Sequence, residues 1–475
     1  MNTRPFRMIS LMAVVATVFG MTIFGVTIWP LVQPYLLPAY KYLPFALAIF
    51  LSAYLTWRFW LIKPRRAWIV TVAVLLFSTP VWLFSVSFVE PLNQWSIALS
   101  LQPENLDLLP VSKDSRALNK ATATIYAQNS NHESLLRAGH PHITADMKDP
   151  LHPRMWWQVP FYYREGLNYF MGSVSKIVRI DADNPGMSVD LHSGEAAQFY
   201  FGEESYFVRT LFAMRLPLSR PSHAQYYLKP DGNWTLLIPA ISYKLSVTGA
   251  MIPYFSSVLE VLPSGWYNVW SPEEAGRNFP GAPLFPLELG RLYAESYGKF
   301  KSGLVNYYDT VLGRNNIYEV SEDSVAGGYS PDDVHVAADN RFPFYQVFEG
   351  LGLTQMIPLE PVGPSFALSE VLLFDGGTGA VRSYIPGAEF SLNGPRKAEK
   401  QVWTALPTFP HEKYKAVEAR IKTGADGKVY WLFTVVNITA DQSVFAKLVL
   451  VDARELTPFA FDSQESVDSF LRGPN

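Results

Sequence analysis

The sequence predicts a membrane protein with an N-terminal three-helix transmembrane anchor and an α+β extracytoplasmic region of tandem antiparallel-sheet modules. The first observation is a partition of charge: residues 1–89 hold seven of the 39 basic residues and none of the 42 acidic ones. The second is a series of aromatic and β-branched segments that recur in pairs beyond residue 90. At 475 residues the chain exceeds the size of a single core, so several folded units are expected.

Three hydrophobic runs predict the transmembrane helices, at about residues 8–32, 43–62 and 68–89. No charged residue occurs between Met8 and Tyr40, and about 20 apolar residues suffice to cross a hydrocarbon core. A cleaved signal peptide is the competing interpretation of the first run. The run is too long for a signal peptide and no A-x-A site follows it, so an uncleaved anchor is favoured.

Basic residues beside the hydrophobic runs predict the orientation. Arg4 and Arg7 precede the first run, and Lys63, Arg65 and Arg66 lie between the second and the third. Positive charge concentrates on the cytoplasmic side, so the N-terminus is expected in the cytoplasm and the C-terminal region outside. The absence of cysteine excludes disulfides and thiolate chemistry and favours a bacterial envelope protein. The expected location is the bacterial inner membrane.

The exported part is expected to divide into a connector and a series of modules. The predicted divisions are a transmembrane anchor at 1–89, a juxtamembrane connector at 90–135, an α+β module pair at 136–275, a helix with a third α+β module at 276–390, and a C-terminal module at 391–475. Within them, helices are expected near 114–127, from Pro286 to Gly313 with a core-facing apolar stripe, and near 411–423.

The paired segments form a degenerate repeat of four hairpins. The expected strand pairs are 156–161 with 175–181, 233–239 with 256–262, 353–357 with 369–375, and 428–437 with 444–452. Aromatic and β-branched residues fill the strands, and Gly, Asp, Asn and Pro mark the turns.

The last repeat carries a family resemblance. Asp426-Gly-Lys428 leads into Tyr430-Trp431, and the second strand ends in Val449 to Ala453. A helix followed by strands of this type resembles the PepSY and cystatin-like domains of bacterial envelope proteins. The other three copies depart from the pattern in their turns. The resemblance implies a small α+β module used in tandem for binding, inhibition or scaffolding.

Only one group of potential metal ligands stands out in the sequence. His140, His142, Asp146, Asp149 and His152 lie close together and offer imidazoles and carboxylates to a divalent ion. Their spacing matches no recognised site, so a solvated polar loop is the favoured interpretation. No residue is assigned as catalytic, cofactor-binding or metal-binding.

Other chemical signatures have simpler structural explanations. Asp375 to Gly379 lacks the ending of a phosphate loop and indicates a tight turn. The acidic pairs Asp332-Asp333 and Glu273-Glu274 are interpreted as exposed turn residues rather than as the carboxylates of a glycosidase. Aromatic clusters are expected in cores and interfaces more often than in a ligand groove. These clusters are Trp156-Trp157, Phe161 to Tyr163, Trp266-Tyr267 with Trp270, and Phe342 to Tyr345.

The sequence favours a membrane-anchored extracytoplasmic scaffold or binding protein within a larger envelope assembly. The expected partners are the lipid bilayer and either other proteins or further copies of the chain. Nucleic acid is disfavoured because no basic face is evident. The alternative is an envelope enzyme acting on glycan or peptide, which predicts a deep pocket with convergent polar groups and shifted pKa values. Transport is disfavoured, because three helices without buried charge offer no pathway.

Overall fold

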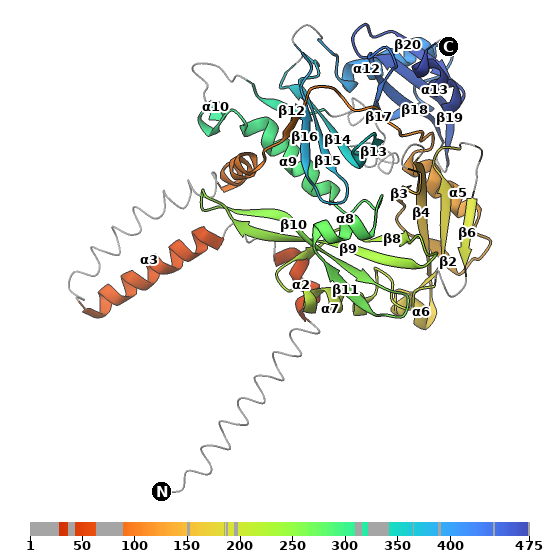
Figure 1. Ribbon diagram of the computed structural model, residues 1–475. Coiled ribbons are helices and arrows are strands. Elements are labelled where there is room, and N and C mark those ends of the chain that lie inside the picture. Colours follow the sequence, from red (N-terminus) through yellow and green to blue (C-terminus); the bar gives the residue numbers. More distant parts are fainter. Residues whose placement is uncertain are drawn as a thin grey trace.

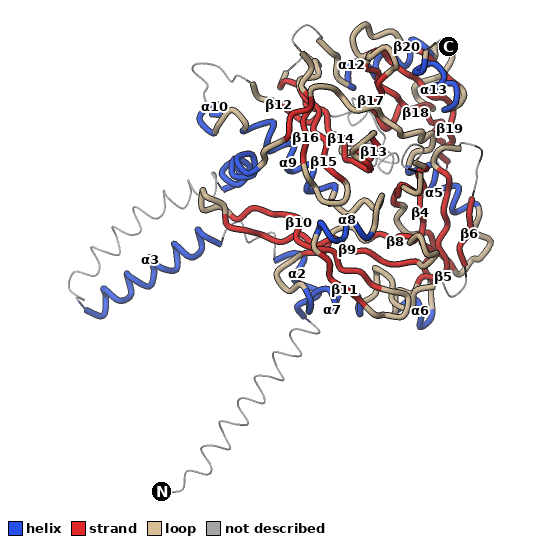
Figure 2. Tube along the Cα trace, viewed as in Figure 1, coloured by secondary structure: helices blue, strands red, loops and turns tan. Residues whose placement is uncertain are grey.

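The fold is a mixed α+β structure in which four β-sheets pack around shared cores. The computed structural model describes residues 28–36, 43–62, 89–149, 153–184, 186, 189–193, 198–308, 316–321, 342–363, 365–387, 391–439 and 442–473. Strands form most of the body and the helices lie mainly at its periphery (Figures 1 and 2).

The first sheet has the order β2-β4-β5-β6, with β3 also paired to β4. Its strands are β2 (Leu136–Ala138), β3 (His142–Asp146), β4 (Arg154–Tyr163), β5 (Val174–Asp181) and β6 (Val189–Ser193). The second sheet has the order β11-β10-β9-β7, with β8 also paired to β9. Its strands are β7 (Arg220–Pro221), β8 (Gln225–Leu228), β9 (Trp234–Leu245), β10 (Met251–Val261) and β11 (Tyr267–Trp270).

The third sheet has the order β1-β16-β15-β14-β12, with β13 also paired to β14, and β1 runs parallel to β16. Its strands are β1 (Glu104–Leu106), β12 (Tyr318–Val320), β13 (Phe344–Phe348), β14 (Gly352–Pro361), β15 (Glu370–Asp375) and β16 (Val381–Tyr384). The fourth sheet is an antiparallel meander of β17 (Tyr414–Thr423), β18 (Val429–Thr439), β19 (Gln442–Asp452) and β20 (Pro458–Phe461).

Helices cover the sheets and connect them. The helices are α2 (Trp29–Leu36), α3 (Leu43–Ile62), α5 (Lys120–Asn129), α6 (Gly166–Phe170), α7 (Tyr206–Arg215), α8 (Pro272–Asn278), α9 (Leu287–Phe300), α10 (Leu304–Tyr308), α12 (Pro395–Ala405) and α13 (Gln464–Arg472). Helix α5 packs between β5 of the first sheet and β19 of the fourth, while α12 and α13 pack on the fourth sheet.

The four predicted hairpins are confirmed as antiparallel strand pairs. They correspond to β4 with β5, β9 with β10, β14 with β15, and β18 with β19. The predicted core-facing helix after Pro286 is also present, as α9 with its buried Leu289, but it ends at Phe300 and a separate short helix, α10, follows.

The transmembrane part of the predicted fold class is corrected by the structure. Helix α3 has the bounds of the expected second span, 43–62, but it carries Ser52, Thr56 and Arg58, and no helix among the described residues is both long and apolar enough to cross a membrane. The expected spans 8–32 and 68–89 lie almost entirely outside the described residues. The predicted three-helix anchor is therefore wrong on this finding, and the described chain is a mixed α+β structure with four sheets.

Two predicted helices differ from the structure. The segment 411–423 forms strand β17 instead of a helix. The helix expected near 114–127 begins only at Lys120, because Asn119 caps it by accepting a hydrogen bond from the backbone N–H of Thr122. Residues 114–118 belong to no helix and instead form hydrogen bonds with neighbouring sheets.

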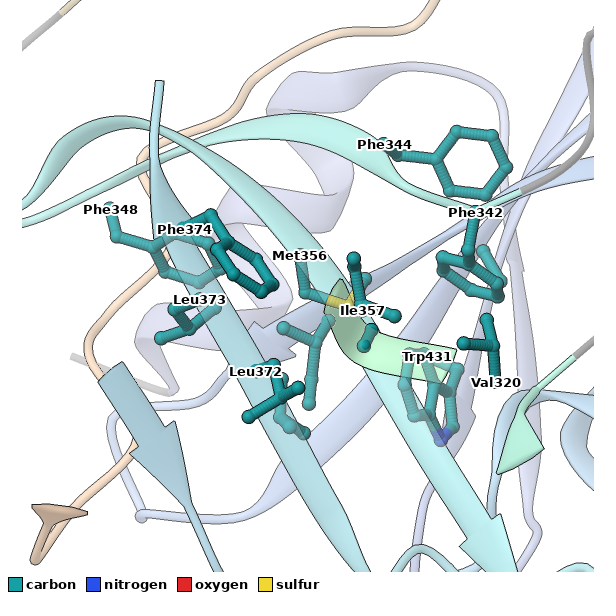
Figure 3. Packing of buried hydrophobic residues seen from close by; sticks show 14 of the residues in the cluster. Val320, Phe342, Phe344, Phe348, Met356, Ile357, Leu372, Leu373, Phe374 and Trp431 are labelled. Atoms are coloured by element: carbon teal, nitrogen blue, oxygen red, sulfur yellow. The ribbon is translucent and has the colours of Figure 1, made fainter. Parts of the chain in front are cut away.

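The hydrophobic cores cross the boundaries of the sheets. The largest one includes Phe285 before α9, Phe374 on β15 and Trp431 on β18. Figure 3 shows this packing at close range, with Phe342, Met356 and Ile357 among the labelled side chains. Because the second, third and fourth sheets contribute to one core, their relative placement is fixed by side-chain packing.

Residues 111–119, here called the central segment, connect three of the sheets by hydrogen bonds. The backbone N–H of Lys113 donates to the Val347 carbonyl on β13 at 2.8 Å. The N–H groups of Ala117 and Leu118 both donate to the Ala182 carbonyl at the end of β5. The central segment thereby occupies the junction between the first, third and fourth sheets.

A cluster of buried charges fixes the central segment to β17. Asp114 is fully buried, with Arg116 at 3.5 Å and Arg420 at 3.6 Å, and Arg116 also lies 3.4 Å from Glu418. The Lys422 ammonium donates to the Asp114 carbonyl. Burial by itself would raise the pKa of Asp114, but the positive charges of Arg116, Arg420 and Lys422 outweigh it and lower that pKa.

The variant Asp114→Asn tests this cluster, because it removes the carboxylate that balances the buried cations. Removing one partner of a buried ion pair costs about 3–5 kcal/mol, so the free energy of unfolding in urea should fall by about that amount. The folded pKa of Asp114 lies below its unfolded value, so its contribution is present above about pH 4 and is lost as pH falls through the folded pKa. As the pH falls, the free energy of unfolding of Asp114→Asn should therefore decrease less steeply than that of the natural chain.

The matched control is Asp107→Asn, because Asp107 is an exposed carboxylate close by in the sequence. It should change the free energy of unfolding by less than about 0.5 kcal/mol. Equal losses in the two variants would contradict the role assigned to Asp114.

Candidate functional site

A cleft beside α7 is the candidate site, with a cavity volume of about 540 Å³ among the described residues. This size falls in the range of roughly 300–1,000 Å³ that is usual for ligand pockets. We call it the α7 cleft. Its lining residues come from the chain before β3, from α6 and α7, and from the turn between β7 and β8. They are His140, Tyr169, Glu203, Glu204, Val208, Arg209, Phe212, Pro221, Ser222, His223, Ala224 and Ile238.

The sequence around residue 203 explains how the cleft's carboxylates are placed. Gly202 lies so close to its neighbours that a Cβ atom there would meet the Gly172 carbonyl oxygen at 2.5 Å. Ser205 caps α7 by accepting from the backbone N–H of Phe207, so Glu203 and Glu204 immediately precede the helix. Negative charge is favourable beside the positive end of a helix dipole.

Glu203 is part of a hydrogen-bonded network with two tyrosines. The Tyr162 hydroxyl donates to Glu203 Oε1 at 2.9 Å and lies 3.2 Å from the Tyr226 hydroxyl. The backbone N–H of Glu203 donates to that same Tyr226 hydroxyl at 3.2 Å. Burial raises the pKa of Glu203 to about 7, and it also raises the pKa values of both tyrosines. Glu203 therefore changes charge near neutral pH, while the tyrosines remain protonated.

The remaining charges of the cleft are of both signs. Arg137 forms an ion pair with Glu204, and its guanidinium carbon lies 5.6 Å from the ring centroid of Tyr162. Arg209 is exposed on α7 and lines the cleft, where its charge lowers the pKa of Glu203 against the larger effect of burial. The cleft thus offers both hydrogen-bond donors and acceptors to a ligand.

His142 contacts Tyr226, whose hydroxyl is bonded to Glu203, and Gln158, which lines a second, smaller cavity. Its Nε2 accepts from the backbone N–H of Tyr226 at 2.9 Å and lies 3.1 Å from Gln158 Oε1. Burial lowers the pKa of His142, which agrees with a neutral ring that accepts at Nε2. Gln158 lines the smaller cavity, whereas the Tyr226 hydroxyl contacts Glu203.

The structure separates the five potential metal ligands noted in the sequence. His140 lines the α7 cleft, His142 bonds to Tyr226, and Asp146 lines the smaller cavity. Asp149 is exposed, and His152 lies outside the described residues. Within the described part of the chain, no three His, Asp or Glu side chains are placed to hold a metal ion together.

The structure also places the turn at Asp375 and one of the two acidic pairs noted in the sequence. Asp375 accepts hydrogen bonds from the backbone N–H groups of Gly377 and Thr378 in the tight turn between β15 and β16, as predicted. Glu273 and Glu274 begin α8, where Glu274 forms a capping box with Ser271. Asp332-Asp333 lies outside the described residues.

Most of the aromatic clusters belong to the cores, as expected. Trp157, Phe161, Tyr162, Phe342, Phe344 and Tyr345 are buried. Trp266 is an exception, because it is exposed at the turn between β10 and β11. Among these clusters, Tyr162 alone has a hydroxyl bonded to a carboxylate of the α7 cleft.

Sequence reasoning missed the residues that matter most in the cleft, namely Glu203, Arg209 and Tyr226. They lie on different elements and belong to no spaced motif, so their convergence depends on the packing of the first sheet against the second. The one local signal was Gly202-Glu-Glu-Ser205 before an apolar helix, which marks a helix start but no function.

Known proteins offer little similarity. No known family matches the sequence, and no curated protein matches it. Among solved structures, the chain is similar to the Bacillus megaterium YpeB C-terminal domain, with a TM-score of 0.12 and 8% sequence identity over 73% of this chain and 99% of that chain. The likeness is weak. It carries no argument about the fold or the function of this chain, and the PepSY resemblance of the last repeat stays a prediction.

The variant Glu203→Gln tests the shifted carboxyl group. Because burial raises its folded pKa to about 7, above an unfolded value of about 4.3, the folded chain binds more protons than the unfolded chain between these values. Stability therefore falls as pH rises through this window. The variant lacks this loss. As the pH rises, its free energy of unfolding should therefore increase relative to that of the natural chain, by at most about 1.4 kcal/mol per pH unit.

The measurement is urea unfolding at a series of pH values between about 4 and 8. Glu165→Gln is the matched control, since Glu165 is exposed and precedes α6. Its pH profile should follow that of the natural chain. If the pH profile of Glu203→Gln also matched that of the natural chain, Glu203 would not titrate in the folded state as described.

Proposed function

We propose that this protein is a non-enzymatic scaffold or binding protein of a larger envelope assembly, and that the α7 cleft receives a segment of a partner polypeptide. The observation that supports this most directly is a group of large exposed side chains on and beside α6 and α7, the two helices that contribute to the lining of the cleft. They are Leu167, Tyr169, Tyr200, Tyr206, Phe207, Met214 and Leu218.

The composition of this exposed group is typical of protein interfaces. Tyrosine, methionine, phenylalanine and arginine are enriched in interface cores, and tyrosine and arginine are frequent hot spots. Arg209 lies on the same helix as Tyr206 and Met214 and lines the cleft. A cleft of mixed charge beside an exposed apolar surface suits a peptide, because the peptide backbone supplies both donors and acceptors and its side chains contact the apolar residues.

The alternative function is an envelope enzyme acting on glycan or peptide. It is favoured by Glu203, whose pKa of about 7 suits a general acid or base at neutral pH. Glycosidases need two carboxyl groups in separate roles. Glu203 and Glu204 are the carboxylates among the described lining residues, and Glu204 is already paired with Arg137. This pairing favours binding over catalysis.

Photo-crosslinking from the cleft tests the proposed function. Tyr169 is 48% exposed and lines the cleft, so its replacement by a photoreactive phenylalanine derivative changes the surface little. Irradiation of cells producing this variant should give a discrete crosslinked protein. The additional change Arg209→Ala should reduce the yield several-fold, because hot-spot arginines carry much of the binding energy.

The matched control is the same replacement at Tyr308 on α10, which is 41% exposed and away from the α7 cleft (Figure 1). No crosslinked protein from Tyr169, or equal products from both positions, would contradict the proposal. Turnover of a glycan or peptide by the purified chain that Glu203→Gln lowers by about 10²–10⁴-fold would support the enzyme instead.

A further inference from the structure

The smaller cavity contains a buried cation whose hydrogen bonds are incomplete. This cavity has a volume of about 150 Å³, and we call it the Arg179 cavity. Its described lining comes from β3 and the turn after it, from β4 and β5, and from β8 with the turn that follows. The polar lining residues are Thr144, Asp146, Lys148, Gln158, Arg179, Tyr227 and Lys229.

The side chain of Arg179 is 11% exposed, and its Nε has no hydrogen-bond partner among the described residues. Asp190 is a neighbouring carboxylate, but its Oδ2 lies 3.9 Å from Nη1, beyond hydrogen-bond distance. Burial lowers the pKa of Arg179, although the nearby aspartates oppose this. A guanidinium with so little exposure normally has its donors satisfied, so the Nε of Arg179 is available to a further acceptor.

The guanidinium is held in place by its neighbours. Its carbon lies 4.2 Å from the ring centroid of Trp156, and Arg179 stands opposite Gln158 in the pairing of β4 with β5. Stacking on an aromatic ring occupies the face of a guanidinium and leaves the N–H groups at its edge available. A planar acceptor with two oxygens suits such an edge.

Two lysines add positive charge to the cavity. Lys229 is fixed by an ion pair of 2.6 Å with Glu260, a buried carboxylate that also accepts from Asn268 and Trp270. Lys148 is exposed in the turn after β3. The ammonium of Lys229 has donors beyond the one that it gives to Glu260.

Nearby carboxylates limit the charge of a ligand. Asp146 lines the cavity itself, and Asp181 and Asp190 act on Arg179 from β5 and β6. A second negative charge on the ligand would be repelled by these groups, so a singly charged anion is favoured over a doubly charged phosphate.

We propose that the Arg179 cavity binds a small carboxylate, with the guanidinium edge of Arg179 donating to its two oxygens and Lys148 closing the site. The carboxylate belongs to a free organic acid or to the end of a side chain or peptide small enough for the cavity. This site is separate from the α7 cleft and does not depend on the function proposed for it.

Calorimetric titration of the full chain with sodium acetate, at constant ionic strength set by sodium chloride, tests the proposal. Acetate should bind saturably, with a dissociation constant on the order of 1 mM. Arg179→Lys keeps the charge but removes the planar fork, so it should weaken binding at least about tenfold. Inorganic phosphate, titrated in the same way, should bind more weakly than acetate.

Because the Arg179 side chain is largely buried, its replacement can destabilise the fold. A second variant therefore separates lost binding from lost stability. Lys148→Gln changes an exposed side chain and should weaken acetate binding a few-fold with an unchanged unfolding curve. Lys428→Gln, the matched control in the turn before β18, should bind acetate as the natural chain does. The proposal is overturned by the absence of saturable acetate binding, by equal binding in Lys148→Gln and Lys428→Gln, or by tighter binding of phosphate.

Discussion

The burial of Asp114 against Arg116, Arg420 and Lys422 is the interaction on which the arrangement of the sheets depends. Charges of this kind are tolerated inside a protein only when their partners are fixed, because each one alone loses its hydration. The central segment supplies the carboxylate and β17 supplies two of the cations. Neither part is satisfied without the other, so the first, third and fourth sheets assume a defined relation to one another.

The α7 cleft depends on a further packing relation, between the first sheet and the second. Tyr162 on β4 and Tyr226 on β8 belong to the core that joins the first sheet to the second, and their hydroxyls hold Glu203. The raised pKa of Glu203 is therefore a property of the packing between two sheets and not of any local motif. His142 accepts from the backbone N–H of Tyr226 and lies beside Gln158, which lines the Arg179 cavity.

The four hairpins could be predicted from the sequence, because β-branched and aromatic residues followed by turn residues are local signals. The cleft could not, because Glu203 and Tyr226 come together only through long-range packing. The N-terminal hydrophobic runs indicated an anchor that the described helices do not support. Residues 411–423 were predicted as an amphipathic helix, but residues 414–423 form strand β17, in which Ala416 and Ala419 both face the core although they are three residues apart, a spacing that a helix would also give.

The cause of that spacing is a β-bulge in β17, where the pairing with β18 shifts between Val417 and Arg420. Ala416 faces the shared core before the bulge, and Ala419 and Ile421 face it afterwards. Glu418, with a φ of 53°, is the extra residue that reverses the alternation. One strand thus presents alanine and isoleucine to one side and a row of charges to the other. Because Glu418 is the extra residue, a strand without it would keep Ala419 and Ile421 on the core side and would lose only the carboxylate that pairs with Arg116.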